Sequence, residues 1–252
     1  MTVRLRRRGL IALLAGGLAL AGCGSGARPA AVPQCTAGSL ILTVEQAQNA
    51  ATIAAVGTRL GLPNHAVTVA LATALQESKL RNLPDGDRDS VGLFQQRPSQ
   101  GWGPPAKLRV PRLSSAAFYR RLVAVPGWAA LPLTEAAQRV QRSGAPDAYA
   151  QWEDQARGLA RALTGEVPAG LSCRFRPVRR PDPALEPTAA LELGPGGLTH
   201  TGAARTWAAA AWLVAHALAY GVTVVSLSGQ TWTANSGAWR PDVKAGSVLA
   251  WR

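Results

Sequence analysis

The sequence predicts a mainly α-helical domain over residues 40–173 and a small α/β domain over residues 198–252. Apolar residues recur at helical spacing from Leu40 to about Gly165, which is typical of packed amphipathic helices. The stretch 174–197 is rich in Pro and Arg and predicts a linker. Beyond it, an apolar run at 204–220 predicts a helix, the β-branched run at 221–229 a strand, the turn-rich run at 230–240 a hairpin and the run at 246–252 a final strand.

Residues 1–22 have the form of an export signal. Four arginines precede the apolar run GLIALLAGGLALAG, which is shorter than the roughly 20 residues of a membrane-spanning helix. Its end, Leu20–Cys23, matches the bacterial lipobox, in which the cysteine is acylated and becomes the new N-terminus. We therefore expect a lipoprotein anchored through lipid (palmitate) on Cys23 to the outer face of the cell membrane. A secretory signal without lipidation is the alternative. Residues 23–39 are predicted to form a tether.

The two remaining cysteines, Cys35 and Cys173, are expected to form a disulfide, because thiols of exported proteins commonly pair. Metal binding is a poor alternative, since neither cysteine has a nearby His or belongs to a CxxC motif. We expect no metal and no cofactor.

The formal net charge is +13, and about +9 remains without the four arginines of residues 1–22. Outside the cytoplasm, the polyanions that such a chain meets are cell-wall polymers and anionic lipid headgroups. Nucleic acid is disfavoured as a partner, because the chain combines an export signal with no recognisable nucleic-acid-binding motif. Protein partners are not indicated.

The helical domain begins with a capping-box pattern at Thr43–Gln46, and Gly61 and Pro63 end the first predicted helix near Leu60. Asn64 is expected to cap a second helix that runs to about Leu80. The segment from Asp85 to about Arg112 is long for a connection, which is typical of a functional loop. Three further helices are expected at Ser115–Val125, Thr134–Ser143 and Asp147–Leu163.

Glu77 lies near the end of the second predicted helix, in the sequence ATALQESKLRN. A carboxyl can act as a general acid when burial raises its pKa towards the working pH. Ala70, Thr73 and Ala74 precede it on the same side, and such small side chains leave room for another molecule. Considered without its neighbours, Glu77 is more simply interpreted as an exposed carboxylate at a helix end.

The nearby sequence DGDRDS resembles a calcium-binding loop only superficially, because Ser90 and Gln96 occupy the positions of the Gly and Glu of such a loop.

Glu77-Ser78, followed by Gly92-Leu93-Phe94-Gln95, resembles the lysozyme superfamily, in which a helix-terminal Glu-Ser precedes a short polar hairpin. The segment AAFYRRL at 116–122 is similar to a helix of lytic transglycosylases. The longer stretch from Ala74 through Trp102 resembles actinobacterial lipoproteins that have a lysozyme-like domain and a C-terminal Trp-rich α/β unit. The resemblance implies a lysozyme-like fold, with Glu77 as the catalytic acid and base.

Two departures bear on the mechanism that the resemblance implies. Ser90 stands where chicken-type lysozymes have an aspartate, with Asp89 one position earlier, so a single-Glu transglycosylase reaction fits better than two-carboxylate hydrolysis. Residues 136–140 read AAQRV, where transglycosylases usually carry an A-Y-N-A-G type sequence whose Tyr positions the sugar.

The expected substrate-binding residues surround Glu77 in the sequence: Ser78, Ser90, Gln95, Gln96 and Trp102. The two glutamines can bind sugar amide and hydroxyl groups or stabilise the turn, and Gln95 is the better candidate for the first role. Trp102 can stack on a sugar or pack the loop onto the core. In the C-terminal unit, the Trp residues more often form core than a binding site.

The sequence therefore predicts an exported, membrane-anchored lipoprotein that acts on the glycan strands of peptidoglycan as a lytic transglycosylase-like or lysozyme-like enzyme. A catalytically inactive lipoprotein that binds the cell wall is the alternative. A solute-binding lipoprotein is disfavoured, because two larger α/β lobes would be expected.

Overall fold

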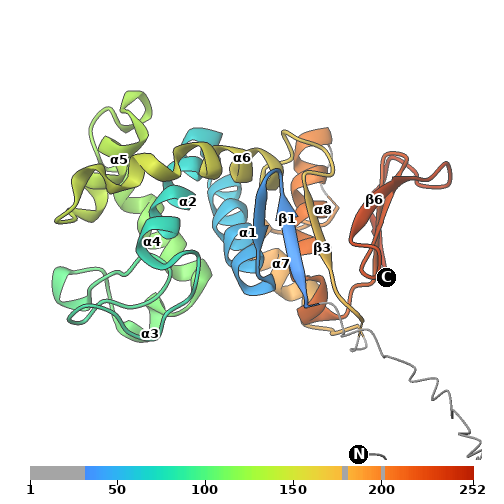
Figure 1. Ribbon diagram of the computed structural model, residues 1–252, viewed down its shortest axis with the longest axis horizontal. Helices are drawn as coiled ribbons and strands as arrows, with labels where there is room; N and C mark the ends of the chain where they lie inside the picture. Colours follow the sequence, from blue (N-terminus) through green and yellow to red (C-terminus); the bar gives the residue numbers. More distant parts are fainter. Residues whose placement is uncertain (1–31, 178–180, 200–201) are drawn as a thin grey trace, which may run out of the picture. The chain divides into compact units, whose positions relative to one another are not determined.

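The computed structural model describes residues 32–177, 181–199 and 202–252, which contain eight α-helices and two small antiparallel sheets (Figure 1). Residues 32–252 belong to one compact unit. The predicted signal peptide and Cys23 lie outside the described residues, as does part of the predicted linker. The mainly helical composition with an α/β part near the C-terminus is confirmed. None of the helices in the described ranges is long and apolar enough to cross a membrane.

Helices α1 (Val44–Arg59) and α2 (Asn64–Ser78) lie close to their predicted ranges. The predicted capping box is present, because Thr43 accepts from the Gln46 N–H while the Gln46 side chain accepts from the Thr43 N–H. Asn64 was expected to cap α2, but Pro63 occupies that position. The Asn64 side chain donates to Glu166 instead, so a tertiary contact replaces the local cap.

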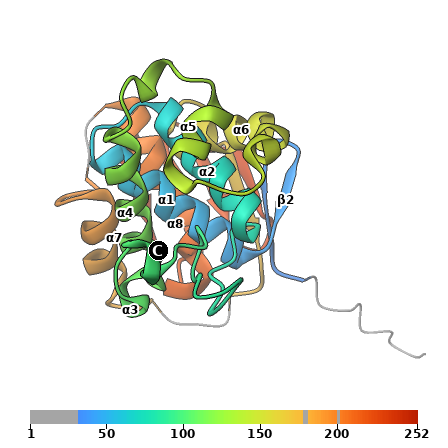
Figure 2. The same cartoon turned by 90° about the vertical axis from the view of Figure 1, so that its left-hand side faces the viewer.

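Four helices complete the N-terminal part of the fold: α3 (Pro105–Leu108), α4 (Pro111–Val123), α5 (Leu133–Gln141) and α6 (Glu153–Leu163). Helix α2 packs against α5 and α6, as Figure 2 shows. The single helix expected over 147–163 is divided into a 3-10 turn, Pro146–Trp152, and α6. The tighter turn brings Tyr149 and Trp152 to the C-terminal end of α2, where both side chains form hydrogen bonds.

A three-stranded sheet with the order β2-β1-β3 joins the two ends of the helical region, which the sequence did not predict. Its strands are β1 (Gln34–Ala37), β2 (Leu40–Leu42) and β3 (Leu171–Arg174). The expected tether over 23–39 therefore ends in a strand. Cys35 and Cys173 are direct cross-strand neighbours in this sheet, and the predicted disulfide is present.

The range expected as a linker, 174–197, contains helix α7 (Leu185–Leu193). Its prolines are compatible with a helix, because Pro181 and Pro183 precede it and Pro187 lies in its first turn. Helix α7 packs against α1. Its buried Glu192 accepts hydrogen bonds from Thr52 of α1 and from Trp212, which follows later in the chain.

The predicted helix, strand and hairpin of the C-terminal segment are all present. Helix α8 (Ala203–Tyr220) precedes a four-stranded sheet of order β6-β5-β4-β7. Its strands are β4 (Val224–Leu227), β5 (Gln230–Thr233), β6 (Ala238–Pro241) and β7 (Ala250–Trp251).

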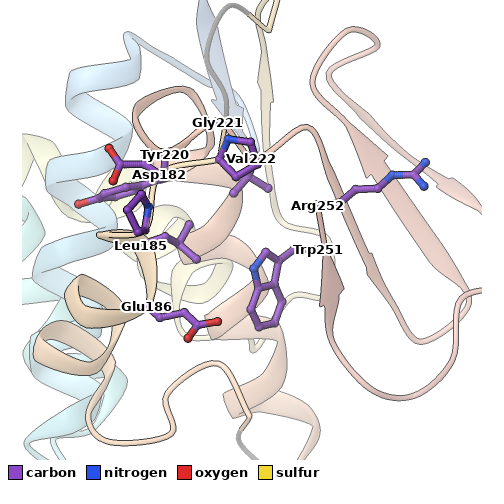
Figure 3. A pocket seen from close by; sticks show the side chains of 10 residues that line it. Asp182, Leu185, Glu186, Tyr220, Gly221, Val222, Trp251 and Arg252 are labelled. Atoms are coloured by element: carbon purple, nitrogen blue, oxygen red, sulfur yellow. The ribbon is translucent and has the colours of Figure 1, made fainter.

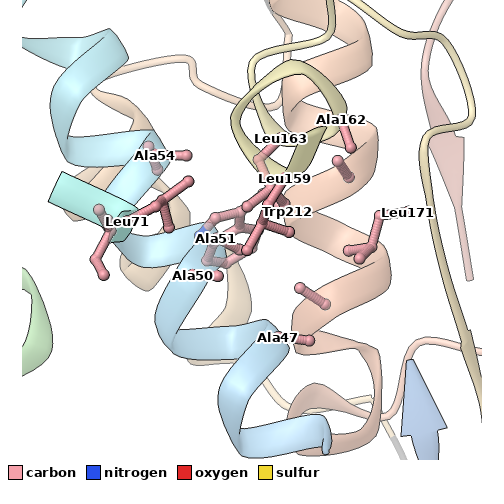
Figure 4. Packing of buried hydrophobic residues seen from close by; sticks show 14 of the residues in the cluster. Ala47, Ala50, Ala51, Ala54, Leu71, Leu159, Ala162, Leu163, Leu171 and Trp212 are labelled. Atoms are coloured by element: carbon pink, nitrogen blue, oxygen red, sulfur yellow. The ribbon is translucent and has the colours of Figure 1, made fainter. Parts of the chain in front are cut away.

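Helix α8 shares a hydrophobic core with the N-terminal helices (Figure 4). Alanines on the buried face of α1, including Ala47, Ala50 and Ala51, leave space in which α8 approaches closely and Trp212 is buried. Such dense packing is what makes changes of core volume costly. The shared core holds α1 in place, and α1 in turn supports the end of α2.

The chain leaves α2 through two successive left-handed residues, Lys79 and Leu80, with φ of 55° and 61°. Leu80 is fully buried, so its carbonyl needs a partner within the protein. Asn49 of α1 donates to this carbonyl at 2.8 Å, and Gln46 donates to the Lys79 carbonyl at 2.8 Å. Two side chains of α1 therefore fix the backbone that directly follows Glu77.

We expect Asn49→Ala to lower the free energy of unfolding by about 1–3 kcal/mol, because it leaves the buried Leu80 carbonyl without its donor. Denaturant unfolding measures the change, and Gln48→Ala, at a half-buried position on the same helix, is the matched control. Equal small effects of both substitutions would show that the Asn49 hydrogen bond does not hold this turn.

Candidate functional site around Glu77

Glu77 lies in the last turn of α2 with its carboxyl partly buried. Its Oε1 accepts hydrogen bonds from the Tyr149 hydroxyl at 2.7 Å and from Gln141 Nε2 at 3.3 Å. Tyr149 comes from the 3-10 turn before α6, and Gln141 is the last residue of α5. Three segments therefore meet at one oxygen of this carboxyl.

The surroundings of Glu77 favour its protonated form. Burial raises the pKa of the Glu77 carboxyl, whereas the hydrogen bonds from Tyr149 and Gln141 and the charge of Lys79 act in the opposite direction with smaller effect. The Lys79 ammonium lies 4.2 Å from the centre of the Trp152 ring. The carboxyl thus holds a proton at higher pH than an exposed glutamate, which a general acid requires.

The predicted hairpin runs from Val91 to Gln96, whose backbones pair in an antiparallel bridge. Gly92 has φ of 78°, and a Cβ at this position would meet the Leu108 carbonyl at 2.4 Å, so glycine is required. Ser78 donates to the Leu93 carbonyl at 2.7 Å, and Gln141 donates to the Phe94 carbonyl at 2.7 Å. The hairpin is therefore fixed directly beside Glu77.

The polar side chains of the hairpin are engaged within the protein. Ser90 donates to Gln95 Oε1 at 2.9 Å, and Gln95 Nε2 donates to the Gly92 carbonyl at 3.1 Å. Gln96 is buried and donates to the Ser114 carbonyl at 3.2 Å. For Gln96, and for the equally buried Ser78, these contacts favour the turn-stabilising role over sugar binding. Gln95 is half-buried and is the glutamine better placed to exchange its contact for a ligand.

Asp89, the other carboxylate considered from the sequence, is bound elsewhere. Its carboxylate accepts from the Ser99 N–H at 2.7 Å and from Arg97 Nε at 2.8 Å. The Ser99 N–H and the Arg97 side chain hold the pKa of Asp89 well below its usual range. Asp89 therefore remains ionised within its own loop and is absent from the partners of Glu77.

Trp102 packs against the hydrophobic core, with the Arg121 guanidinium 3.7 Å from the centre of its ring. Arg121 also donates to the carbonyls of Gln100 and Gly101. One face of the indole is thus covered by a cation that is itself held by the loop. This geometry favours the loop-packing role of Trp102 over sugar stacking.

Tyr149 and Gln141 are the site residues that the sequence did not reveal. The segment 136–140 lacks the tyrosine that transglycosylases carry there, and the structure brings a tyrosine to Glu77 from a later segment. Glu77 and Tyr149 are 72 positions apart in the sequence, so no local pattern connects them. The only available signal was the rarity of tyrosine, with three in the whole chain.

We expect Tyr149→Phe to raise the pKa of Glu77 further, because it removes a hydrogen bond that favours the ionised carboxylate. A carbon-13 NMR titration of the glutamate carboxyls would measure this shift. Tyr220→Phe, which removes a hydroxyl bonded to Thr188, is the control and should leave the titration unchanged. A lower pKa in Tyr149→Phe would contradict the assigned role of this hydrogen bond.

Comparison with protein-family models and with curated proteins finds no match to this sequence. Across the described ranges, no three His, Cys, Asp or Glu side chains are grouped so that they could hold a metal ion.

Proposed function

We propose that this protein is an exported lipoprotein that cleaves the glycan strands of peptidoglycan as a lytic transglycosylase-like enzyme. The observation that carries the proposal is the state of Glu77, a partly buried carboxyl whose pKa is raised and whose Oε1 is held by Tyr149 and Gln141. The Glu-Ser and Gly-Leu-Phe-Gln segments, which carry the resemblance to lysozyme-like proteins, lie side by side through the Ser78–Leu93 hydrogen bond.

In the proposed reaction, protonated Glu77 donates its proton to the glycosidic oxygen as the bond to the anomeric carbon breaks. The resulting carboxylate then accepts the proton of the C6 hydroxyl of the same sugar, and the C6 oxygen attacks the anomeric carbon. The product is an anhydro sugar, and Glu77 is again protonated. With Oε1 engaged by Tyr149 and Gln141, Oε2 is the oxygen left to carry the proton.

The internal hydroxyl is preferred over water because no second carboxylate is among the partners of Glu77 in the part of the chain that the structure describes. Two-carboxylate glycosidases place a second Asp or Glu about 5–9.5 Å from the acid to act as nucleophile or base. Asp89 is the nearest candidate in the sequence pattern, and Ser99 and Arg97 engage it instead. A single carboxyl that serves first as acid and then as base needs no such partner.

The proposed location follows from the lipobox cysteine, Cys23, and from the basic charge of the chain. Acylation of Cys23 would hold the protein at the outer face of the membrane, next to the wall polymers. The positive charge would favour association with anionic polymers there.

One observation favours the second candidate function, a wall-binding protein without activity. Gln96 is committed to the Ser114 carbonyl and Trp102 is covered by Arg121, which leaves fewer side chains for sugar contacts beside Glu77.

Incubation of the full-length protein with purified insoluble peptidoglycan separates the two functions. We expect both cosedimentation with the wall and release of soluble muropeptides. Cosedimentation without any release would favour the inactive binder and overturn the enzymatic proposal.

A further inference from the structure

Trp251 differs from the other tryptophans of the C-terminal segment. Trp207, Trp212 and Trp232 are buried, and the Trp239 indole donates to the Leu171 carbonyl at 2.8 Å. Trp251 is partly buried and packs against the core, as Trp239 does, but its indole N–H has no hydrogen-bond partner among the described residues. The expectation that these tryptophans form core therefore fits the others better than Trp251.

Trp251 lines a pocket of about 420 Å³ between α7, the end of α8 and β7 (Figure 3). Leu185 and Val222 form part of its apolar wall. A second pocket of about 270 Å³ adjoins it and shares Trp251 and Glu186. The first pocket is within the size range of small-molecule sites, which measure roughly 300–1,000 Å³.

The polar groups of this pocket divide into engaged and free ones. Asp182 accepts from the Ala184 N–H, and the Tyr220 hydroxyl donates to Thr188. The Glu186 carboxylate is exposed and has no partner in the part of the chain that the structure describes. Arg252 also lines the pocket, and Figure 3 shows its side chain directed away from the Trp251 ring. Beside the indole, the groups without a partner among the described residues are thus one donor, the Trp251 N–H, and one acceptor, the Glu186 carboxylate.

We propose that this pocket is a second saccharide-binding site, separate from Glu77. A pyranose ring offers an apolar face that can lie on the indole and hydroxyl groups that can donate to Glu186, while its oxygens can accept from the Trp251 N–H. A negative ligand charge beside the indole is disfavoured, because the Glu186 carboxylate lies on the same side of the pocket. The site would hold a glycan strand while Glu77 acts on it, and this role rests on the proposed function.

The test is isothermal titration of the full-length protein with an N-acetylglucosamine trimer. The Glu77→Gln variant serves as the parent, so that no cleavage occurs. We expect Trp251→Leu and Glu186→Gln each to weaken the binding about tenfold or more, since each removes a contact to the sugar. Asp154→Asn, which makes the same charge change at an exposed position of α6, is the control and should bind as the parent does.

Glu186→Gln is the decisive variant if Trp251→Leu lowers the melting temperature, because Glu186 is exposed and has no contact to lose. Unchanged affinity in Glu186→Gln, or absence of binding in the parent, would overturn the second site. Binding of pentane-1,5-diamine in preference to the trimer would also overturn it, in favour of a cation site. Muropeptide release by the wild type is measured separately. Loss of the second saccharide site can therefore be distinguished from failure of the enzymatic function proposed for Glu77.

Discussion

Replacing Glu77 by glutamine is expected to slow muropeptide release by about 10²–10⁴-fold, the usual contribution of a general acid–base group. Glutamine cannot donate and recover a proton, yet its carbonyl oxygen can accept the same hydrogen bonds from Tyr149 and Gln141. The geometry of the site is thus preserved while its acid is removed. Initial rates on purified peptidoglycan measure the effect.

The variant should lose activity without losing stability. Because burial raises the pKa of Glu77 in the folded chain, ionising this carboxyl costs more in the folded than in the unfolded state. The wild type therefore loses stability, relative to Glu77→Gln, as pH rises from the ordinary pKa of glutamate through the raised one. At pH 7 we expect the variant to be at least as stable in denaturant unfolding.

Glu153→Gln is the control for the activity loss, because it removes an exposed ion pair with Arg157 on α6. Its release rate should stay near that of the wild type. A similar loss in both variants, or full activity in Glu77→Gln, would remove Glu77 from the mechanism.

The second large effect is expected at the disulfide. The double substitution of Cys35 and Cys173 by alanine should lower the free energy of unfolding by about 4–5 kcal/mol, because the bond closes a loop of 138 residues. Domains are commonly stable by only about 5–15 kcal/mol, so the variant is expected to be close to unfolding. Chemical denaturation under non-reducing conditions measures the difference.

Thr36→Ala with Ser172→Ala is the matched control, since these residues form the neighbouring cross-strand pair of β1 and β3. It should cost far less than loss of the disulfide. If the two double variants were equally stable, the disulfide would not be what joins the start of the helical region to its end.

Local signals predicted the parts of the fold that local interactions determine. The Thr43–Gln46 capping box and the hairpin of residues 230–240 lie where their residue types indicated. The sheet β2-β1-β3 was missed, because strands of three or four residues are too short to show a period and their pairing joins distant segments. Helix α7 was missed because prolines indicated a linker, although Pro187 lies in its first turn and the other prolines lie outside it.

The residues of the candidate site likewise fall into those that local sequence predicted and those that depend on tertiary packing. Glu77, Ser78 and the hairpin Gly92–Gln95 could be found from adjacent sequence, and hydrogen bonds link them in space. Tyr149 could not be found, because its relation to Glu77 depends on how α6 and the preceding turn pack on α2. For Trp102, the sequence left two roles open, and the position of Arg121 over its ring favours packing.

The mass of the sugar ends released from peptidoglycan in water enriched in oxygen-18 tests directly whether the C6 hydroxyl is the attacking group. Attack by the C6 hydroxyl consumes no water, so we expect the wild type to release anhydro ends without the heavy isotope and Glu77→Gln to release none. New reducing ends in place of anhydro ends would contradict the proposed mechanism, because they would show that water, and not the sugar's own hydroxyl, attacks at Glu77.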